Sequence, residues 1–505
     1  MLPTRRSEPR SARIPPIPRE SQRLTTFTDN RVRLAAGTPR PAHGTADGLG
    51  PVARAVIITL ATVFGSLLIP HDAQPADAMR NSAIVLAVAL LLIPAVEAAA
   101  RGIKPALKVR NVLLIGVVYW VLADLVQGLY PIDATTEGIE TAFLATGIFA
   151  AGLSVGSAIR IGGLPAGIRH IVRLELSDRH VLTLATFCFV VGIFYFVFMA
   201  DFSSSLIMEA LLDRGRFAAP WARGVLGDWH SFIEQFIYFG YLLPPFAAVM
   251  YMRSRSLLNL KTIYCMLLSA CFLVFPAQGG GRTNIGATLG SALLVAVLLS
   301  RRSLRTIHVV MMLAALFAVQ VAMNVILQNR GSGYGELQVN DWTFSRIRVD
   351  DNFNRMAQTA DFVPAYYPYS GLQFVFFSLV RPIPRALWPG KPVYQGFTVQ
   401  EALGEEDTSL TNSVIGEAYS GYGFSLVLVM GMFFGALARW WEQTLEAPPT
   451  SGGVMLYALG AMALFGALRG FVNIVLLSYP ILSLWAASAF FRYMRGRSAG
   501  RRRSA

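Results

Sequence analysis

The chain has 505 residues, of which 54% are hydrophobic and only 15% are charged, and its mean hydropathy is +0.48. Soluble domains carry about 25% charged residues, so this composition excludes soluble enzymes, disordered proteins and disulfide scaffolds. The 44 Lys and Arg exceed the 30 Asp and Glu by 14 charges. In membrane proteins such an excess gathers in cytoplasmic loops, so the composition predicts an all-α polytopic membrane protein.

The two ends of the chain are basic and lack apolar runs. Residues 1–54 contain ten Arg with many Pro, Ser and Thr, and residues 492–505 contain six more Arg. A cleavable signal peptide needs an apolar stretch, so we expect two basic cytoplasmic tails, the first of them disordered. The three Cys lie inside apolar stretches without metal or redox spacing, and we expect them to be core residues.

The region between the tails, residues 55–491, is predicted to be a transmembrane helical domain. A membrane helix needs about 20 apolar residues, and twelve runs approach that length: 55–70, 82–99, 111–130, 139–157, 181–200, 231–252, 262–278, 284–300, 308–327, 421–438, 453–469 and 472–491. With the N-terminus inside, the inside segments hold 31 of the 44 Lys and Arg. The positive-inside rule therefore predicts that both termini are cytoplasmic.

Residues 328–420 are predicted to form a large extracytoplasmic loop. Within it the apolar run 371–380 is only ten residues long, which as a helix spans about half of a bilayer core. Pro382 and Pro384 end the run, so we expect a re-entrant or interfacial half-helix. The chain shows no internal repeat and no inverted pair of broken spans, which argues against a secondary transporter.

Cations on the predicted outer side are informative because membrane insertion disfavours them there. The segment RGRFAAPWARG, residues 214–224, alternates Arg214, Arg216 and Arg223 with aromatic residues. Guanidinium groups match phosphate and carboxylate oxygens, and aromatic rings stack on sugar faces. The alternative is an interfacial amphipathic segment.

Two short outer turns carry one Arg each. In GGGRTN, residues 279–284, the glycines let backbone N–H groups approach an anion, and Arg282 adds charge. The alternative is a tight hairpin with an exposed Arg. Arg469 lies between the last two spans, at an apolar helix end, and needs a partner or an anionic ligand.

The segment RPIPRALWPGKP, residues 381–392, is the strongest signal in the chain. It places Arg381, Arg385 and Lys391 directly after the short apolar run, and its prolines keep it stiff. A rigid cationic loop at headgroup level suits a lipid pyrophosphate, and the alternative is a structural lid.

Candidate acid–base groups are few. GEAYSGYG, residues 416–423, brings Glu417 and Tyr419 to the outer edge of a span, where ionisable groups are costly and often functional. His230 and Glu234 share a helix face, and His230 is a candidate general base or a structural interfacial residue. Glu97 and Asp124 are scattered intramembrane acids. The chain contains no HExxH, CxxC or EF-hand pattern, so no metal site is suggested.

RPIPRALWPGKP followed by TNSVIGEAYSGYG and a span resembles the bacterial oligosaccharide repeat-unit polymerases, also called O-antigen or exopolysaccharide polymerases. GGGRTN and the Arg-rich 214–224 segment are also similar to that family, and the resemblance covers roughly residues 200–440. It implies a glycosyltransferase at the outer face of the bacterial inner membrane. Such an enzyme moves the growing glycan from undecaprenyl pyrophosphate to the next lipid-linked repeat unit.

The resemblance also implies partners and residue roles. The donor is already activated, so no cofactor is expected. The expected partners are undecaprenyl-pyrophosphate-linked oligosaccharides, membrane lipids, a chain-length regulator and a flippase, without nucleic acid. Pyrophosphate binding and leaving-group stabilisation fall to cations: Arg381, Arg385 and Lys391, completed by Arg282 and Arg469. The second lipid-linked substrate or its acidic sugars are positioned by Arg214, Arg216 and Arg223. Tyr419 is a candidate for sugar binding or for an aromatic belt, and Glu417 or His230 accepts the proton from the attacking hydroxyl.

Three other functions stay open at this point. An O-antigen ligase uses the same donor with a lipid A core or protein acceptor. A lipid-phosphate-sugar-dependent glycosyltransferase favours acids in the first outer loop, where Asp72 and Asp77 form no clear acidic motif. A flippase for lipid-linked oligosaccharides needs charge along a cavity through the bilayer, whereas the cations here cluster at the outer surface.

Overall fold

The computed structural model describes residues 49–490, apart from 70–74, 130–132, 214–217, 223–231, 301–305, 330–333, 384, 386, 393–394, 406–409 and 446–448. The chain divides into two compact units, residues 1–47 and 48–505, and all described residues belong to the second. Nearly all of the predicted N-terminal tail and the whole C-terminal tail therefore lie outside the described residues.

The described residues form helices and no strand, which confirms an all-α membrane fold. In this part of the chain, nine helices are long and apolar enough to cross a membrane: Met79–Arg101, Val109–Gln127, Thr136–Gly156, Asp178–Met199, Leu260–Gln278, Arg282–Leu299, Val310–Gln328, Ser413–Leu445 and Val472–Phe490. Two shorter apolar helices accompany them, α2 (Pro51–Ser66) and α21 (Ser451–Ala467).

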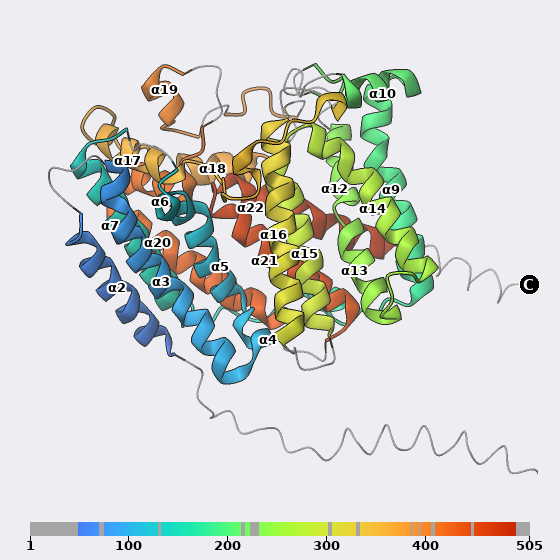
Figure 1. Ribbon diagram of the computed structural model, residues 1–505, viewed down its shortest axis with the longest axis horizontal. Coiled ribbons are helices and arrows are strands. Elements are labelled where there is room, and N and C mark those ends of the chain that lie inside the picture. Colours follow the sequence, from blue (N-terminus) through green and yellow to red (C-terminus); the bar gives the residue numbers. More distant parts are fainter. Residues whose placement is uncertain are drawn as a thin grey trace, which may run out of the picture. The chain divides into compact units, whose positions relative to one another are not determined.

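The helices carry the labels of Figure 1 from here on. The long ones include α3 (Pro75–Arg101), α7 (Thr136–Gly156), α9 (Asp178–Met199), α14 (Leu260–Gln278), α15 (Arg282–Leu299), α16 (Thr306–Gln328) and α20 (Ser413–Glu442). The span over 109–127 is built from α5 (Val109–Val117), a π-helical turn (Val118–Leu122) and α6 (Ala123–Gln127). The last span begins with α22 (Val472–Leu476), and the short helices include α4 (Ile103–Ala106), α8 (Ala166–Val172) and α10 (Ser204–Leu212).

Three of the twelve predicted spans are not membrane-length helices: 55–70 and 453–469 correspond to the shorter helices α2 and α21, and 231–252 is broken. The run 231–252 is divided into a 3-10 turn at Glu234–Phe236, α12 (Ile237–Gly240) and α13 (Leu243–Ser254). Pro244 and Pro245 have no N–H to donate to the carbonyls four residues earlier, which breaks the helix at this point. Hydropathy alone missed the break because both prolines stand among apolar residues.

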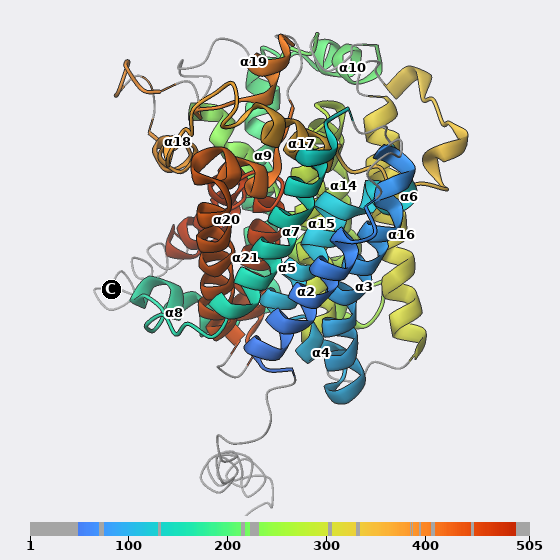
Figure 2. The same ribbon diagram turned by 90° about the vertical axis from the view of Figure 1, so that its left-hand side faces the viewer.

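Helix directions alternate so that two sets of segments gather at opposite ends of the bundle. The short helices α17 (Asn352–Phe362), α18 (Gln373–Val380) and α19 (Val399–Leu403) lie at one end together with α10, and α4 lies at the other (Figures 1 and 2). We call these the loop end and the α4 end. The loop end collects the segments predicted to be outside, and the α4 end those predicted to be inside.

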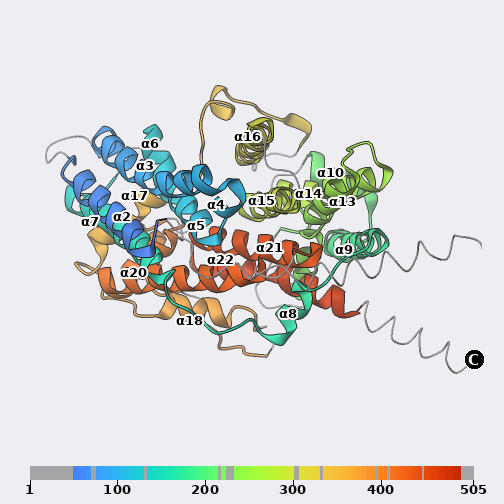
Figure 3. The same cartoon turned by 90° about the horizontal axis from the view of Figure 1, so that it is seen from below.

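Close packing of α7 against α20 rests on two glycine pairs spaced four residues apart. A Cβ at Gly152 or Gly156 would overlap the α20 backbone at Leu428 or Met432, and a Cβ at Gly431 or Gly435 would overlap the α7 backbone. Small residues at this spacing let membrane helices approach closely. By contrast, α16 lies at the periphery, and only 11% of its membrane window is buried in the protein (Figure 3).

The predicted half-helix at 371–380 is present as α18, which spans eight residues, or about 12 Å. It docks beside a break in α20, where Tyr422 and Gly423 leave helical geometry. The backbone N–H groups of Ser370 and Gly371 donate to the carbonyls of Ser420 and Gly421, at 2.9 and 3.1 Å. These bonds satisfy carbonyls that the break would otherwise leave unpaired, as a membrane environment requires.

Two predicted boundaries were wrong. Helix α2 begins at Pro51, so Arg54 is not part of a tail, and α20 begins at Ser413, eight residues before the predicted start of its span at 421. Glu417 and Tyr419 therefore lie inside a helix and not in the segment before one. Their stretch looks polar in sequence, but residues 416–421 and Gly423 are buried, and only Tyr422 is exposed.

A buried ionic network explains the position of Arg54. Its Nη2 donates to Glu97 Oε2 at 3.0 Å and its Nη1 to Asn111 Oδ1 at 3.1 Å. Asn111 in turn donates to Glu97 Oε2 at 2.8 Å, and Lys108 Nζ lies 3.3 Å from Glu97 Oε1. Glu97 is thus a structural partner at the α4 end.

Candidate functional site

The turn Leu468–Phe471, between α21 and α22, is the meeting point of segments that are remote in the sequence. The Val414 N–H donates to the Leu468 carbonyl at 3.1 Å, which fixes the start of α20 on this turn. Phe374 of α18 packs its ring edge-on against Phe471 with centroids 5.7 Å apart. The loop end therefore brings α18, α20 and α22 together at one point.

Glu417 is held by the same turn. Its side chain is buried, and its Oε2 accepts a hydrogen bond of 2.7 Å from the Phe471 N–H. Its Oε1 lies over Gly470, 3.3 Å from where a Cβ would stand. A carboxylate in this position orients the turn and, through it, the neighbouring Arg469.

Arg469 and Arg282 converge on one carboxylate. Arg469 Nε lies 2.5 Å from Asp350 Oδ2, and Arg282 Nη2 lies 3.4 Å from Asp350 Oδ1. The exposed fraction of the side chain is 25% for Arg469, 20% for Arg282 and 16% for Asp350. Arg282 and Arg469, which were predicted to complete the anion site of the cationic loop, lie close together, and the anion between them is a residue of the chain.

Asp350 belongs to residues 343–351, which cross the loop end before α17 and which we call the strap. Side chains of the spans hold its backbone. Gln127 of α6 donates to the Ile347 carbonyl at 3.0 Å and accepts from the Ile347 N–H at 2.8 Å. The other bonds are Val349 N–H to Asp124 Oδ1, Arg282 Nη2 to the Val349 carbonyl, and Asn324 Nδ2 to the carbonyls of Thr343 and Arg346.

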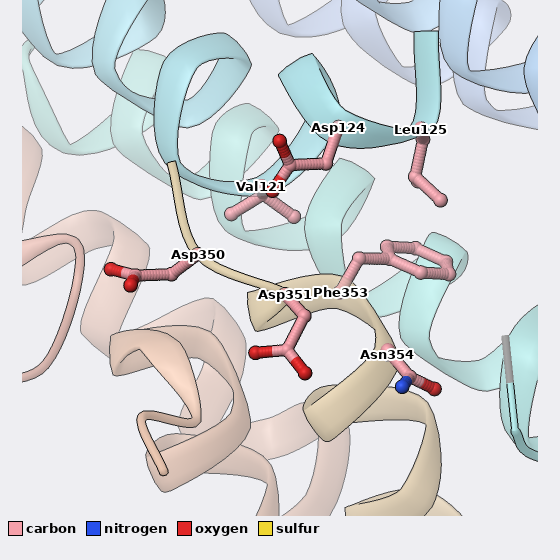
Figure 4. A pocket seen from close by; sticks show the side chains of 7 residues that line it. All are labelled: Val121, Asp124, Leu125, Asp350, Asp351, Phe353 and Asn354. Carbon is pink, nitrogen blue, oxygen red and sulfur yellow. The ribbon is translucent and has the colours of Figure 1, made fainter. Parts of the chain in front are cut away.

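A small hollow lies where the strap passes the α6 end of the span over 109–127 (Figure 4). Its lining residues are Val121, Asp124, Leu125, Asp350, Asp351, Phe353 and Asn354. The π-helical turn just before Asp124 widens the helix here, and its Trp120 carbonyl accepts a 2.9 Å bond from Asn352 Nδ2. Such turns often mark functional sites in helices. Among the described residues, no group of His, Cys, Asp and Glu is arranged to hold a metal ion.

The cationic loop, residues 381–391, follows α18. Lys391 Nζ donates to the carbonyls of Arg381 and Ile383 at 2.8 and 2.9 Å, so it closes the loop on itself. Burial, and then the charges of Arg381 and Arg385, lower the pKa of Lys391. Three cations therefore share one short loop, and their mutual repulsion favours a bound anion.

The side chains of this loop differ in how they are held. The Arg381 guanidinium lies 5.9 Å from the centre of the Phe377 ring. No hydrogen bond or ion pair is found for the Arg385 guanidinium among the described residues. Arg381 and Glu234 both act electrostatically on the Tyr479 hydroxyl, which brings the broken helix 232–254 close to the cationic loop.

The predicted site residues fall into three groups. Arg381, Arg385 and Lys391 share the cationic loop, and Arg282, Arg469 and Glu417 lie around the Leu468–Phe471 turn. Tyr419 is buried and packs against Phe424 with ring centroids 5.5 Å apart, so in this structure it contacts protein. Arg214, Arg216, Arg223 and His230 lie outside the described residues.

Sequence reasoning missed Asp350. The loop that contains it holds several acids, and nothing in the pattern SRIRVDD distinguishes Asp350 from Asp351. Asp124 was noticed as an intramembrane acid, but its contact with the strap depends on tertiary structure.

Comparison with known proteins adds one family match. A family model described as a domain of unknown function, DUF8712, matches residues 262–474. No curated protein and no solved structure matches the chain. The matched range contains Arg282, the strap, the cationic loop, Glu417 and Arg469, which are the parts that meet at the loop end.

Proposed function

We propose that this protein is a polymerase of lipid-linked oligosaccharide repeat units. It transfers the growing glycan from undecaprenyl pyrophosphate to the next lipid-linked unit at the outer face of a bacterial inner membrane. The observation that carries the proposal is that Arg282, Arg469 and Glu417 gather at the Leu468–Phe471 turn. Helix α18, which leads into the cationic loop, packs on the same turn through Phe374. In this orientation the loop end faces outward and both termini are cytoplasmic, as the positive-inside rule predicts.

The chemistry asks for anion binding and one proton transfer. A sugar hydroxyl of the acceptor forms a new bond to the anomeric carbon of the donor, and the bond from that carbon to the pyrophosphate oxygen breaks. The proton goes to a base on the protein, and the lipid pyrophosphate leaves with the electron pair. Preorganised cations stabilise the charge that develops on this leaving group.

The geometry supports a division of labour among the cations. The Arg385 guanidinium has no hydrogen bond or ion pair among the described residues, and it is a planar donor fork suited to phosphate. Arg381 and Lys391 shape the loop that presents it, since Lys391 binds two loop carbonyls. Arg282 and Arg469 provide a second anion position beside the turn.

The base is Glu417 or His230 in this proposal. Glu417 already uses Oε2 to hold the Phe471 N–H, so as a base it would act through Oε1. The second lipid-linked substrate, or its acidic sugars, is positioned in this proposal by Arg214, Arg216 and Arg223. Tyr419 contributes to sugar binding.

The positions of the ionic groups favour an enzyme over a flippase. The described ion pairs gather at the α4 end, as in Arg54–Glu97 and Arg253–Glu175, or at the loop end, as in Arg469–Asp350. A flippase needs polar groups along the path through the bilayer, whereas a transferase needs them where the two lipid-linked substrates meet.

The test is complementation of a deletion strain with wild-type protein or with Arg385→Ala. Surface and lipid-linked glycans are compared by gel and mass spectrometry. Loss of the long ladder with complete single repeat units remaining, and no rescue by Arg385→Ala at normal protein level, is the expected result. Arg169→Ala, which changes an exposed Arg on α8, is the matched control and should restore the ladder.

Other outcomes contradict the proposal in distinct ways. Intact polymer that stays on its lipid carrier identifies a ligase. Incomplete repeat units identify a lipid-phosphate-sugar-dependent glycosyltransferase, and complete units trapped on the cytoplasmic side identify a flippase.

A further inference from the structure

The carboxylate of Asp350 occupies the position that an anionic ligand of Arg282 and Arg469 would take. Each of its two oxygens faces one guanidinium, at 3.4 and 2.5 Å. We propose that Asp350 is an internal competitor: it holds the arginine pair in the resting protein, and a phosphate-bearing ligand displaces it and releases the strap. The identity of that ligand as a lipid pyrophosphate rests on the proposed function.

Solvent access favours exchange. Asp350 is shared between the Arg282 and Arg469 guanidinium groups, and all three side chains retain access to solvent. A pyrophosphate offers more negative charge and more acceptor oxygens than a carboxylate, and Arg binds phosphate in a bidentate manner. The ligand therefore gains more from the arginine pair than Asp350 does.

The strap is anchored at its two ends by buried residues. Thr343 and Asn352 are fully buried at the two ends. Asn324 and Gln328 bind Thr343, while Asn352 binds the Trp120 carbonyl and accepts from Thr411. These contacts keep the ends in place when the middle moves.

The middle of the strap depends on side chains of the spans. Every hydrogen bond described between residues 344–350 and the spans has a side chain on at least one side, such as Gln127, Asp124 or Arg282. Such bonds exchange for water without breaking a helix or a sheet. The Asp350 ion pairs add two contacts of the same kind, and their loss loosens the middle of the strap beside the hollow that Asp124 lines.

Asp350 and Asp351 form a matched pair for the test. Asp351 lies next in the chain but pairs with Arg355 of α17, at 2.8 Å, and not with Arg282 or Arg469. Removing either charge by Asp→Asn changes the local net charge equally. Only the Asp350 change removes the carboxylate that both Arg282 and Arg469 contact.

The first measurement is titration of the detergent-solubilised full chain with inorganic pyrophosphate by calorimetry. Asp350→Asn should bind about tenfold more tightly than wild type, as loss of two competing partly exposed ion pairs allows. Asp351→Asn should bind as wild type does, and Arg469→Gln in the Asp350→Asn background should abolish the gain.

The second measurement is limited digestion with trypsin after Arg346, whose carbonyl is held by Asn324 in the resting strap. Pyrophosphate should accelerate this cleavage in wild type, and Asp350→Asn should be cleaved rapidly without ligand. The wild-type digestion needs no variant, so it remains decisive if Asp350→Asn does not fold.

The failures of the two proposals are distinguishable. Unchanged pyrophosphate affinity in Asp350→Asn, or pyrophosphate that slows cleavage after Arg346, overturns the competitor role and leaves the polymerase proposal to the glycan analysis. If Asp350→Asn gains affinity but the deletion strain keeps its long polymer, the competitor role stands and the polymerase proposal fails.

Discussion

The two ends of the bundle use the same ionic motif in different surroundings. At the α4 end Glu97 forms ion pairs with Arg54 and Lys108, and at the loop end Asp350 forms ion pairs with Arg282 and Arg469. The Arg54 and Glu97 side chains are 4% and 2% exposed, whereas those of the loop-end trio are 16 to 25% exposed.

The difference in burial distinguishes a structural ionic network at the α4 end from an exchangeable one at the loop end. A buried charge that loses its partner has no water to replace it, so the α4-end network is fixed. A partly exposed pair contributes little to stability and exchanges partners readily. Asn111 completes the closed network with a further hydrogen bond to Glu97, while the loop-end cluster opens beside a hollow.

The largest expected effect is on stability at the α4 end. Glu97→Gln leaves Arg54 buried without its anion, and we expect a loss of about 3–5 kcal/mol in the free energy of unfolding. Unfolding of the purified protein in detergent measures it, with the exposed Glu401→Gln of α19 as the control. A loss below about 1 kcal/mol would contradict a structural role for this network.

At the loop end the effect should fall on activity. Arg469→Gln removes one donor from the proposed anion site, and we expect polymer formation to fall about 100-fold. Stability should change by about 1 kcal/mol or less because the pair with Asp350 is partly exposed. In vitro polymerisation and unfolding of the same preparation separate the two readouts. An unfolding loss as large as that of Glu97→Gln would erase the contrast between the ends.

Helix α20 links the two regions, because it carries Glu417 near the loop end and Glu442 near the α4 end. Gly435→Ala forces a Cβ into the Leu153 carbonyl of α7, and we expect it to cost about 1–3 kcal/mol and to reduce activity. Gly286→Ala has only the Met323 sulfur near its Cβ, at 3.9 Å, and serves as the matched control. Equal unfolding of the two variants would contradict the close-packing role.

The smallest expected effect is a pH dependence. Burial and neighbouring arginines lower the pKa of Lys391 from its usual 10.5, so the folded protein loses this proton before the unfolded chain does. Its charge therefore destabilises the fold at neutral pH, and stability should rise with pH between the lowered value and 10.5. Pyrophosphate affinity should fall over the same window. Lys391→Arg stays charged, and a decline of equal size in that variant would exclude Lys391 as its cause.

Some residues of the candidate site could be predicted from the sequence. The Arg-rich loop after α18 and the lone arginines at Arg282 and Arg469 stand out because cations are disfavoured on the predicted outer side. The grouping of Arg282 and Arg469 around one carboxylate could not be predicted from the sequence, because it depends on contacts between residues as far as 119 positions apart, as in Arg469–Asp350. Asp350 itself was missed for the same reason.

The sequence by itself determined the all-helical membrane class and the short helix α18. Eleven of the twelve predicted apolar runs also correspond to apolar helices, nine of them of membrane length, among the described residues. The length of an apolar run and the bias of charge between loops are local properties, so they can be predicted from the sequence alone. Only the tertiary structure decided that Arg54 pairs with Glu97, that the Pro244–Pro245 run is broken, and that α7 and α20 pack glycine to backbone. Inside a bilayer, polar groups and helix breaks must be satisfied by partners from elsewhere in the chain, and those partners are fixed by packing.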